Sequence, residues 1–352
     1  MVQSKQWVLA KQPTGSPQLS GPEQTFKLVQ TEIPAPKDDQ LLLKLQYLSN
    51  DPAQRGWIGS TVSPERLYVP QIQEGQVMRA RGLCEVVESQ SSRYRAGDSV
   101  LATVGWSEFA CVAASEVQPA PELPGGLNRT HYLGALGMTG MTAYFGLMDV
   151  AQVKAGDVVV VSGAAGAVGS MAVQIAKKMV GCRQVIGMAG TDEKCRWVEN
   201  LGADQCLNYK SFTFKQDLVA ATPSPDGFAD VYFDNVGGDT LDLMLTRMAR
   251  HGRVACCGAI SNYNTRPDKT VGLKNWFEVI SMRIKCEGFI VLDYVRRFGE
   301  GREAFQKALS EGKLQVEGSE QVVPATFESI PETWMTLFSG GNTGKLITDV
   351  RG

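Results

Sequence analysis

Histidine is scarce in this chain, in which His131 and His251 are the only two among 352 residues. Eight cysteines occur, but they are scattered along the sequence and form no C-x-x-C pair. Catalytic zinc sites draw on clustered histidine and cysteine, and most serine or cysteine nucleophiles need a histidine base. The sequence therefore predicts no metal site and argues against catalysis by a nucleophile with a histidine base.

Three further features are missing, and each excludes a class of protein. No apolar run approaches the ~18 residues of a membrane span, and the N-terminus lacks the apolar core of a signal peptide. The formal net charge of −2 gives no basic footprint for nucleic acid. The composition, 43% apolar and 20% charged, is ordinary for a globular chain long enough for two domains. We expect a cytoplasmic protein with neither membrane nor nucleic-acid partners.

Residues 156–194 carry the strongest local pattern. Residues 158–162 read VVVVS, which is typical of a strand buried on both faces of a parallel sheet. Residues 170–178 have helical periodicity, and residues 185–188 suit a second strand. Between the first strand and the helix, glycines recur at a spacing of three: Gly163, Gly166 and Gly169. A glycine turn in this context indicates pyrophosphate binding, although such turns also occur without a ligand.

The second strand of this unit bears on which dinucleotide would bind. An NAD site usually carries Asp or Glu about 20 residues after the glycines, to bind the ribose 2′-hydroxyl. Met188, Ala189 and Gly190 stand there instead. Lys194 follows at the start of the next helix, where a cation can pair with a 2′-phosphate, whereas Asp192 suits a helix N-cap or a ribose ligand. The pattern favours NADP, with an ordinary solvated lysine as the alternative reading of Lys194.

The rest of the chain has β-rich ends and an alternating middle. Residues 5–118 contain many short strand patterns separated by turns, as in a small barrel or sandwich. Residues 133–149 are helical in period despite several glycines, which suggests close backbone approach to a cofactor or another helix. Helices and strands alternate over residues 195–310, among them predicted helices over residues 240–248 and 294–310 and a predicted strand over residues 283–291. This alternation predicts a doubly wound parallel sheet. The tail after residue 313 returns to strand character.

Ligands bind doubly wound sheets at the carboxyl ends of the strands. Asn235, residues 257–263 and residues 289–291 each fall at the end of a predicted strand. We therefore expect these three segments to line the same site as the glycine turn.

Seven segments, in this order within residues 133–348, resemble motifs of the zinc-independent medium-chain dehydrogenases/reductases: LGMTGMTAYFGL, SGAAGAVGS, AGTDEK, LGADQCLNYK, DNVGG, CGAISNYN and GNTGKLI. Within that family the chain is most similar to the branch of prostaglandin reductases, leukotriene 12-hydroxydehydrogenases, plant double-bond reductases and curcumin-reductase-like proteins. The match is looser near the N-terminus, where the family's D-P-Y-M-R reads Asp51-Pro52-Ala53-Gln54-Arg55.

The resemblance implies an α/β fold in which a Rossmann domain is inserted into a GroES-like β-barrel domain. The NADP-binding Rossmann domain would span residues 128–315, and the GroES-like domain would combine residues 1–127 and 316–352. The resemblance also implies NADPH-dependent reduction of the C=C bond of α,β-unsaturated ketones and aldehydes, by a homodimer. The substrate itself would be selected by residues 50–76 and the surroundings of Tyr263, so it does not transfer from the family.

The family's functional residues carry over to positions of this chain that match its motifs. The pyrophosphate would be held by Gly166, Ala167, Val168 and Gly169, and the 2′-phosphate and ribose by Lys194 and Tyr209. The remaining cofactor contacts would come from Asn235, Cys257, Gly258, Ala259, Ile260, Ser261, Tyr263, Phe289, Ile290, Val291 and Asn342. Tyr263 would also be the catalytic tyrosine.

The resemblance leads to a specific mechanism for Tyr263. Hydride transfer to the β-carbon of an enone places negative charge on the carbonyl oxygen, and a preorganised donor there stabilises the transition state by ~3–4 kcal/mol. The phenol of Tyr263 would be that donor, unless it only packs on the nicotinamide. Two other activities remain open on the same scaffold, quinone reduction and zinc-independent alcohol dehydrogenation, and so does a non-catalytic NADPH-binding protein.

Overall fold

The computed structural model describes residues 1–59 and 62–351, which form two compact units. Unit 1 comprises Met1–Gly134, Asn264–Pro267 and Glu320–Gly352, and unit 2 comprises Ala135–Tyr263 and Asp268–Ser319. The short segment Asn264–Pro267 thus belongs to unit 1 although the chain on both sides of it belongs to unit 2.

Unit 2 is built on a six-stranded parallel sheet with the strand order β10-β9-β8-β11-β12-β13. The strands are β8 (Val158–Val161), β9 (Gln184–Ala189), β10 (Gln205–Asn208), β11 (Ala229–Asp234), β12 (Met248–Cys256) and β13 (Lys285–Gly288). Numbered along the chain from β8, the strands have the Rossmann order 3-2-1-4-5-6. Strands β9 and β10 are added on one side of β8 and strands β11 to β13 on the other, so the topological switch point lies between β8 and β11. The predicted fold class, a doubly wound parallel sheet, is confirmed.

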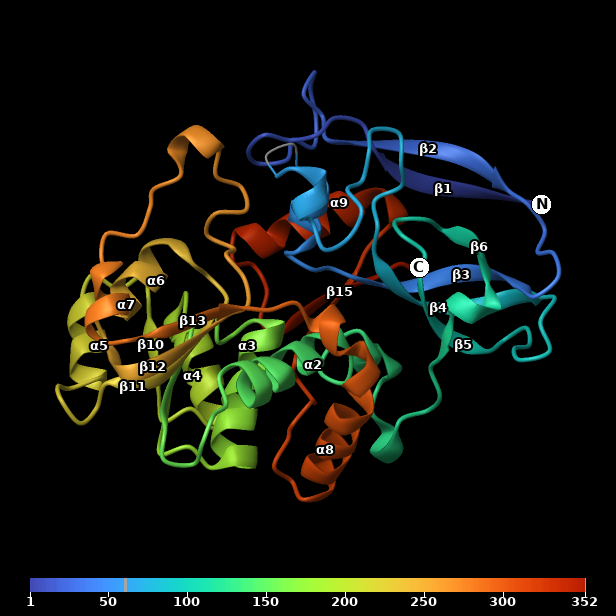
Figure 1. Cartoon of the computed structure of the whole chain (residues 1–352). Coiled ribbons are helices and arrows are strands. Elements are labelled where there is room, and N and C mark those ends of the chain that lie inside the picture. Colours follow the sequence, from blue (N-terminus) through green and yellow to red (C-terminus); the bar gives the residue numbers. More distant parts are fainter. Residues whose placement is uncertain (60–61, 352) are drawn as a thin grey trace. The chain divides into compact units, whose positions relative to one another are not determined.

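The helices of unit 2 alternate with these strands (Figure 1). They are α2 (Met138–Phe145), α3 (Ala167–Gln174), α4 (Asp192–Asn200), α5 (Phe214–Ala221), α6 (Gly238–Leu245), α7 (Phe277–Ser281) and α8 (Phe298–Ser310). Both α2 and α3 continue as π-helical turns, Gly146–Val150 and Ile175–Val180. The four valines of β8 are fully buried, which explains why their sequence shows no alternation.

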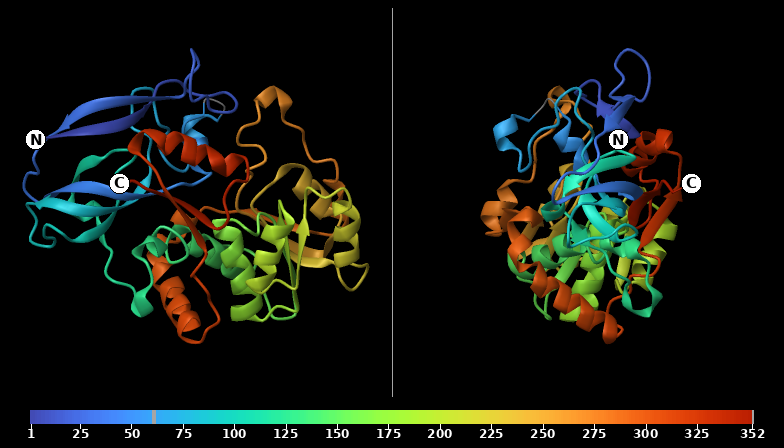
Figure 2. Two further views of the ribbon diagram at one scale, coloured as in Figure 1. Left: turned by 180° about the vertical axis from the view of Figure 1, so that it is seen from behind. Right: turned by 90° about the vertical axis from the view of Figure 1, so that its right-hand side faces the viewer.

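Unit 1 combines strands from both ends of the chain (Figure 2). Its larger sheet has the order β14-β15-β3-β4-β5-β7, with β6 also paired to β3, while β1 and β2 form a separate antiparallel pair. These strands are β1 (Val2–Leu9), β2 (Phe26–Ile33), β3 (Gln40–Ser49), β4 (Arg81–Ser89), β5 (Ser99–Thr103), β6 (Phe109–Ala113), β7 (Gln118–Pro119), β14 (Glu320–Pro324) and β15 (Lys345–Asp349).

Three large aromatic side chains pack together in the core of unit 1. Phe26, Trp106 and Trp334 are buried, with ring centroids 4.9 Å apart for the first pair and 5.8 Å apart for the other two. Trp334 lies on α9 (Ile330–Met335), so the tail of the chain helps to build the N-terminal β structure. This unit also contains the short helix α1 (Gln54–Trp57).

The helix expected from residue 133 begins later, at Met138, and the chain just before it packs closely on its first turn. A Cβ added to Gly140 would lie 1.8 Å from the carbonyl oxygen of Ala135, so the chain before the helix folds tightly onto it. Gly146 similarly faces the rings of Phe233 and Phe289 at 2.6 and 2.5 Å from an added Cβ. Within unit 2 these glycines therefore accommodate neighbouring backbone and aromatic rings.

Other element borders differ from the sequence predictions. The strand predicted over residues 283–291 is shorter, since β13 ends at Gly288 and a 3-10 turn occupies Val291–Arg297. That turn delays α8 to Phe298, four residues after the predicted start at Tyr294. The helix predicted to run through Met248 ends at Leu245, because Met248 opens β12 beside Ala229. None of the helices described in residues 1–59 and 62–351 is both long and apolar enough to cross a membrane.

Candidate cofactor site and the polar cluster of unit 1

The glycine turn of unit 2 connects β8 to α3 through main-chain hydrogen bonds. The N–H of Gly166 donates to the carbonyl of Gly163 at 2.9 Å, and Gly163 has a positive φ of 58°. A Cβ on Gly169 would lie 2.2 Å from the carbonyl oxygen of Gly163. The start of α3 therefore packs directly on the turn, with the N–H groups of its first residues, Ala167 and Val168, lacking acceptors within the helix. Such a helix start suits a phosphate.

Two lysines gather where β9 and β10 end. The side chain of Thr191 accepts a hydrogen bond from the N–H of Lys194 at 3.2 Å, so Thr191 is the N-cap of α4 and the N-cap role considered for Asp192 was wrong. Burial, with the charge of Lys210 as the second cause, lowers the pKa of the Lys194 ammonium. The Lys210 ammonium lies 5.9 Å from the centre of the Tyr209 ring. Two cations at one strand edge favour an anion between them.

Lys210 is a residue of this edge that the sequence interpretation missed. The sequence contained an indication of this role, because Lys210 directly follows Tyr209 at the end of the motif LGADQCLNYK. The hydroxyl of Tyr209 lies over Gly190, 2.9 Å from where a Cβ would stand. The amide of Asn208 donates to the carboxylate of Asp192 at 2.7 Å and so ties the end of β10 to the start of α4.

Asn235 is held at the switch point between β8 and β11. Its side-chain amide donates to the carbonyl of Ser162 at 2.7 Å, and its N–H donates to the Ser162 hydroxyl at 3.0 Å. Beside it, the buried carboxylate of Asp234 accepts hydrogen bonds from Ser162, Tyr232 and the N–H groups of Val236 and Gly237, at 2.8 to 3.1 Å. The position of Asn235 is therefore fixed by Ser162, which directly follows β8.

The segment after β12 folds back on Asn235 and ends at Tyr263. The N–H groups of Cys257 and Gly258 donate to the carbonyl of Asp234 at 2.8 and 3.1 Å. The Ile260 N–H donates to the Asn235 carbonyl at 3.4 Å, and the Ser261 hydroxyl donates to the Val236 carbonyl at 2.6 Å. Burial raises the pKa of the Cys257 thiol to about 12, so this thiol is protonated near neutral pH. These bonds bring residues 257–261 and Asn235 together, as expected.

Tyr263 lies over the same turn. Its hydroxyl oxygen accepts a hydrogen bond from the Ala259 N–H at 3.3 Å, and the same oxygen stands 3.1 Å from where a Cβ of Gly258 would be. The phenol oxygen is therefore fixed close to the main chain of the predicted cofactor segment.

Phe289, Ile290 and Val291 follow β13 at the same end of the sheet. The ring of Phe289 packs edge-on against Phe233, with centroids 6.2 Å apart and planes at 76°. The same ring lies beside Gly146, where an added Cβ would stand 2.5 Å from it, so one part of the ring packs inside unit 2.

Asn342 belongs to unit 1, in the turn before β15. Its side-chain amide donates to the Gly344 carbonyl at 2.8 Å, and the next N–H, of Thr343, donates to Gln321 at 3.0 Å. The following buried Lys345 donates to the Asn50 carbonyl at 2.9 Å and pairs with the Asp51 carboxylate at 2.5 Å. The turn that carries Asn342 is thereby fastened to residues 50 and 51.

A polar cluster surrounds that segment in unit 1, and we call Asn50–Arg55 the anchor segment. The ring N–H of Trp334 donates to the Asp51 carbonyl at 3.3 Å, and the amide of Gln54 donates to the Arg79 carbonyl at 2.9 Å. Arg55, 3% exposed, donates to Asn264 and to carbonyls of the loop at residues 13–15. Of the substrate-selecting residues 50–76 expected from the family, residues 60 and 61 lie outside the described part.

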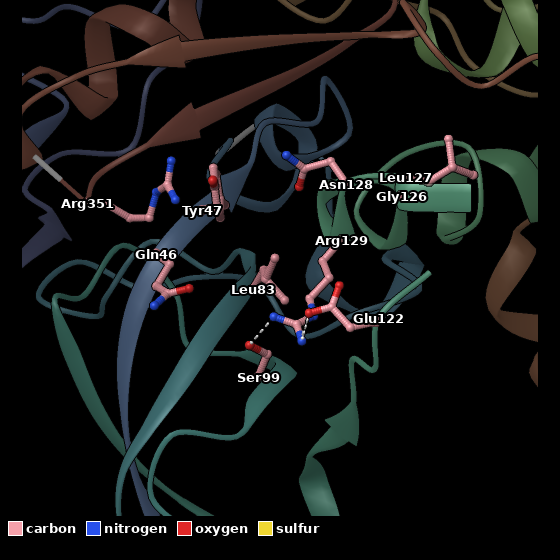
Figure 3. A pocket seen from close by; sticks show the side chains of 10 residues that line it. All are labelled: Gln46, Tyr47, Leu83, Ser99, Glu122, Gly126, Leu127, Asn128, Arg129 and Arg351. Carbon is pink, nitrogen blue, oxygen red and sulfur yellow. Dashed lines mark hydrogen bonds and ion pairs between the residues drawn. The ribbon is translucent and has the colours of Figure 1, made fainter. Parts of the chain in front are cut away.

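A hollow of about 300 Å³ opens elsewhere in unit 1 (Figure 3). Its side chains are mostly polar, and Arg129 reaches Ser99 at 3.1 Å and Glu122 at 2.6 Å. It is lined by Gln46, Tyr47, Leu83, Ser99, Glu122, Gly126, Leu127, Asn128, Arg129 and Arg351. No predicted site residue lines it, so it is separate from the chemistry considered above.

Across residues 1–59 and 62–351, no group of three or more histidine, cysteine, aspartate or glutamate side chains is arranged to hold a metal ion. His131 instead lies 2.9 Å from the carboxylate of Glu320, and the eight cysteines are free thiols.

The chain matches two family models and several characterised proteins. Residues 5–120 match the N-terminal domain of oxidoreductase, and residues 167–311 match a model described as zinc-binding dehydrogenase. Prostaglandin reductase 1 of Mus musculus is 39% identical over 355 residues, which cover 99% of both chains. The NADPH-dependent curcumin reductase of Escherichia coli is 36% identical, covering 99% of this chain and 97% of that protein.

A solved structure agrees with these sequence matches. The crystal structure of CurA from Vibrio vulnificus in complex with NADPH has a TM-score of 0.88 and 34% identity, covering 99% of both chains. Fold, site and relatives together define an oxidoreductase of the Rossmann type. The chain belongs to the zinc-independent medium-chain dehydrogenase/reductase family, as its motifs indicated.

Proposed function

We propose that this protein is an NADPH-dependent reductase that acts on the C=C bond of α,β-unsaturated ketones and aldehydes. The observation that carries the proposal is the fixed phenol of Tyr263. Its oxygen accepts a hydrogen bond from the Ala259 N–H, which holds this hydroxyl, a group able to donate as well as accept, beside the predicted cofactor segment. The named activities of the mouse and Escherichia coli relatives support the same reaction class.

The residues of unit 2 fit the cofactor. Because Gly169 lets the start of α3 pack directly against Gly163, the main-chain N–H groups of Gly166, Ala167, Val168 and Gly169 would hold the pyrophosphate. Lys194 and Tyr209, joined by Lys210, would hold the 2′-phosphate and ribose. The nicotinamide half would lie along Asn235, Cys257, Gly258, Ala259, Ile260, Ser261, Phe289, Ile290 and Val291, with Asn342 as a contact from the tail.

The chain's own contribution to the reaction is to orient the substrate and stabilise charge. Bound NADPH supplies the hydride that is added to the β-carbon. Tyr263 donates a hydrogen bond to the substrate's carbonyl oxygen, where negative charge develops as the enolate forms. Solvent then protonates the α-carbon.

Replacing Tyr263 by phenylalanine tests this role. We expect Tyr263→Phe to lower kcat for an enone about 100-fold, the usual effect of removing one donor to a developing oxyanion. The dissociation constant for NADPH should stay within twofold, because the phosphate contacts are untouched. An unchanged kcat would show that the tyrosine only packs on the nicotinamide.

A substrate panel separates the proposal from its rivals. NADPH oxidation at 340 nm would be followed with an enone, a quinone and a saturated ketone. Reduction of the enone alone supports the proposal, whereas turnover restricted to the quinone or the ketone would indicate a quinone reductase or an alcohol dehydrogenase. Binding of NADPH without turnover of any of the three would indicate a non-catalytic protein.

We further propose that the protein is a homodimer, on the basis of an uncovered sheet edge. In the described part of the chain β13 ends the strand order, and Lys285, Cys286 and Gly288 are exposed. The helix before it, α7, exposes Phe277 at 70% and Ile280 at 63%. A two-fold axis at this edge would pair β13 with its copy and cover these side chains. Sedimentation of wild type and Phe277→Glu tests this, with a monomeric wild type as the contrary result.

The domain assignment and the location are also proposals. We assign residues 128–315 to NADP binding and residues 1–127 with 316–352 to the GroES-like domain, a division that the two compact units support with borders a few residues away. Eight free thiols support the cytoplasm as the location. Cell fractionation tests this, and recovery of the protein with membranes would contradict it.

A further inference from the structure

Arg55 is a buried cation that the proposed mechanism does not use. Its side chain is 3% exposed, and burial lowers the pKa of its guanidinium to about 10. None of the ion pairs found in the described residues includes it. An unpaired buried charge is costly, so its hydrogen-bond partners must offset that cost.

Those partners come from two loops that are far apart in the sequence. One terminal nitrogen, Nη2, donates to the carbonyls of Pro13 at 3.2 Å and Gly15 at 2.6 Å. Nε donates to Oδ1 of Asn264 at 3.0 Å. The two loops also touch each other, since a Cβ on Gly15 would lie 3.3 Å from the side chain of Arg266. The planar guanidinium thus joins both loops with several donors at fixed angles.

The contact between Arg55 and Asn264 matters because Asn264 directly follows Tyr263 in the chain. Asn264 begins the four-residue segment that packs with unit 1, and it follows Tyr263, the last residue of a stretch of unit 2. On one side of the peptide bond, Tyr263 is held by the Ala259 N–H. On the other side, the chain is held by Arg55. Fixing Asn264 therefore fixes the direction in which the main chain leaves Tyr263.

We propose that Arg55 is a positioning residue for enone reduction, which fixes Asn264 and thereby the phenol of Tyr263. This inference rests on the proposed function and adds to it a residue that touches neither substrate nor cofactor. The physical basis is geometric, because small displacements of a reacting group lower catalysis steeply while leaving binding of distant groups intact.

Four proteins test the inference: wild type, Arg55→Lys, Asn264→Ala and the double variant. Lysine keeps the charge but cannot reach both loops with fixed geometry. We expect each single variant to lower kcat for the enone about tenfold, with KM for NADPH within twofold. The double variant should also be about tenfold slower, because the two residues act through one contact. An Asn264→Ala protein with wild-type kcat, or a double variant about 100-fold slower, would overturn the proposal.

Two controls separate positioning from simple stability. Asn264→Asp keeps an acceptor for Nε of Arg55, so it should retain at least half of the wild-type kcat, and a tenfold loss there would count against the contact. Arg93→Lys makes the same exchange at an exposed arginine paired with Asp39, and it should leave kcat unchanged. A lower melting temperature with normal kcat in Arg55→Lys would assign Arg55 a purely structural role.

A readout without turnover keeps this inference distinct from the proposed function. Hydrogen–deuterium exchange of the peptide covering residues 258–267 should be faster in Asn264→Ala than in wild type. Unchanged exchange would overturn the contact's role even if the enzyme reduces enones. A wild type that reduces no enone would instead refute the proposed function, while the exchange result would still report on the contact.

Discussion

The glycine turn of unit 2 and the anchor segment Asn50–Arg55 of unit 1 are organised in opposite ways. The turn is made of main chain, and its contacts join residues a few positions apart, such as Gly163 and Gly166. The anchor segment is held by polar side chains, of which Arg55 is buried and Asp51 is partly exposed. Their partners, among them Lys345 and Asn264, lie far away in the sequence. A site built from local backbone can be predicted from the sequence, whereas a site built from side chains that are distant in the sequence cannot.

The two regions also differ in what compensates the positive charge of their lysine and arginine side chains. The edge near the turn gathers Lys194 and Lys210 at the ends of strands, where an anion can neutralise them. The anchor segment encloses Arg55 and contacts the buried Lys345, which are compensated by carbonyls, by Asn264 and by Asp51. Cations in the first region suit a ligand, and those in the second hold the chain.

The largest effect is expected for Gly169→Ala, a substitution in the glycine turn. The added Cβ would stand 2.2 Å from the Gly163 carbonyl oxygen and 2.7 Å from the Cα of Ala164, both of which are backbone atoms that cannot rotate away. We expect a displacement of α3 that costs about 3 kcal/mol, which weakens NADPH binding roughly 100-fold. Fluorescence titration with NADPH measures this.

The matched control for that change is Gly156→Ala. An added Cβ there meets nothing within 4 Å, and Gly156 is not among the glycines with a positive φ. Its NADPH affinity should equal that of wild type. If Gly169→Ala binds NADPH normally, the turn does not hold the pyrophosphate.

The medium effect is expected at Lys345→Met, which acts on the anchor segment. The side chain of Lys345 is 2% exposed, and its loss leaves the carboxylate of Asp51, itself 31% exposed, without its partner. We expect a loss of about 2 kcal/mol in the free energy of unfolding, below the usual cost of breaking a fully buried pair because Asp51 can reach water. Thermal denaturation should show a melting temperature lower by about 4–8 °C.

The NADPH affinity of Lys345→Met distinguishes the two regions. It should remain within twofold of wild type, because the phosphate contacts belong to unit 2. The exposed Lys313, paired with Glu311, provides the control, and Lys313→Met should change neither quantity. A fall in NADPH affinity with unchanged stability would mean that the anchor segment serves the cofactor directly.

Some features of the fold and the site could be predicted from the sequence, and others could not. The strand, glycine turn and helix over residues 158–178 were predicted because every signal is local. The site at Asn235 was predicted from its place after a strand, but the Ser162 contact that fixes it required knowing that β8 and β11 are neighbours. Lys345 occurs in a recognised motif, yet its burial depends on Asn50, which lies 295 residues earlier.

Steric detail explains the remaining differences. The helix begins at Met138, and the main chain of Ala135 packs closely on Gly140, a tertiary contact that hydrophobic periodicity does not reveal. Thr191 rather than Asp192 caps α4. Both residue types are good N-caps, so the sequence does not distinguish them, and the position at which the chain leaves β9 decides which one caps the helix. The membership of Asn264–Pro267 in unit 1 is likewise a matter of tertiary packing.

The smallest effect is expected at Lys194→Ala, which sharpens the account of the cofactor site. A single lysine near a phosphate contributes less than the turn, and Lys210 remains beside it, so we expect about tenfold weaker NADPH binding, or ~1.4 kcal/mol. Binding of NADH, which lacks the 2′-phosphate, should be unchanged. Lys215→Ala, at an exposed lysine on α5, should alter neither affinity.

The pH dependence of this preference provides a second measurement on the same residue. Burial and the charge of Lys210 lower the pKa of Lys194, so its ammonium loses its proton at a lower pH than an ordinary lysine. As the pH rises through that lowered pKa, wild type should lose part of its preference for NADPH over NADH, and Lys194→Ala should show a smaller change. Equal pH dependence in the two proteins would mean that the 2′-phosphate is bound by other groups, with Lys210 the first to test by substitution.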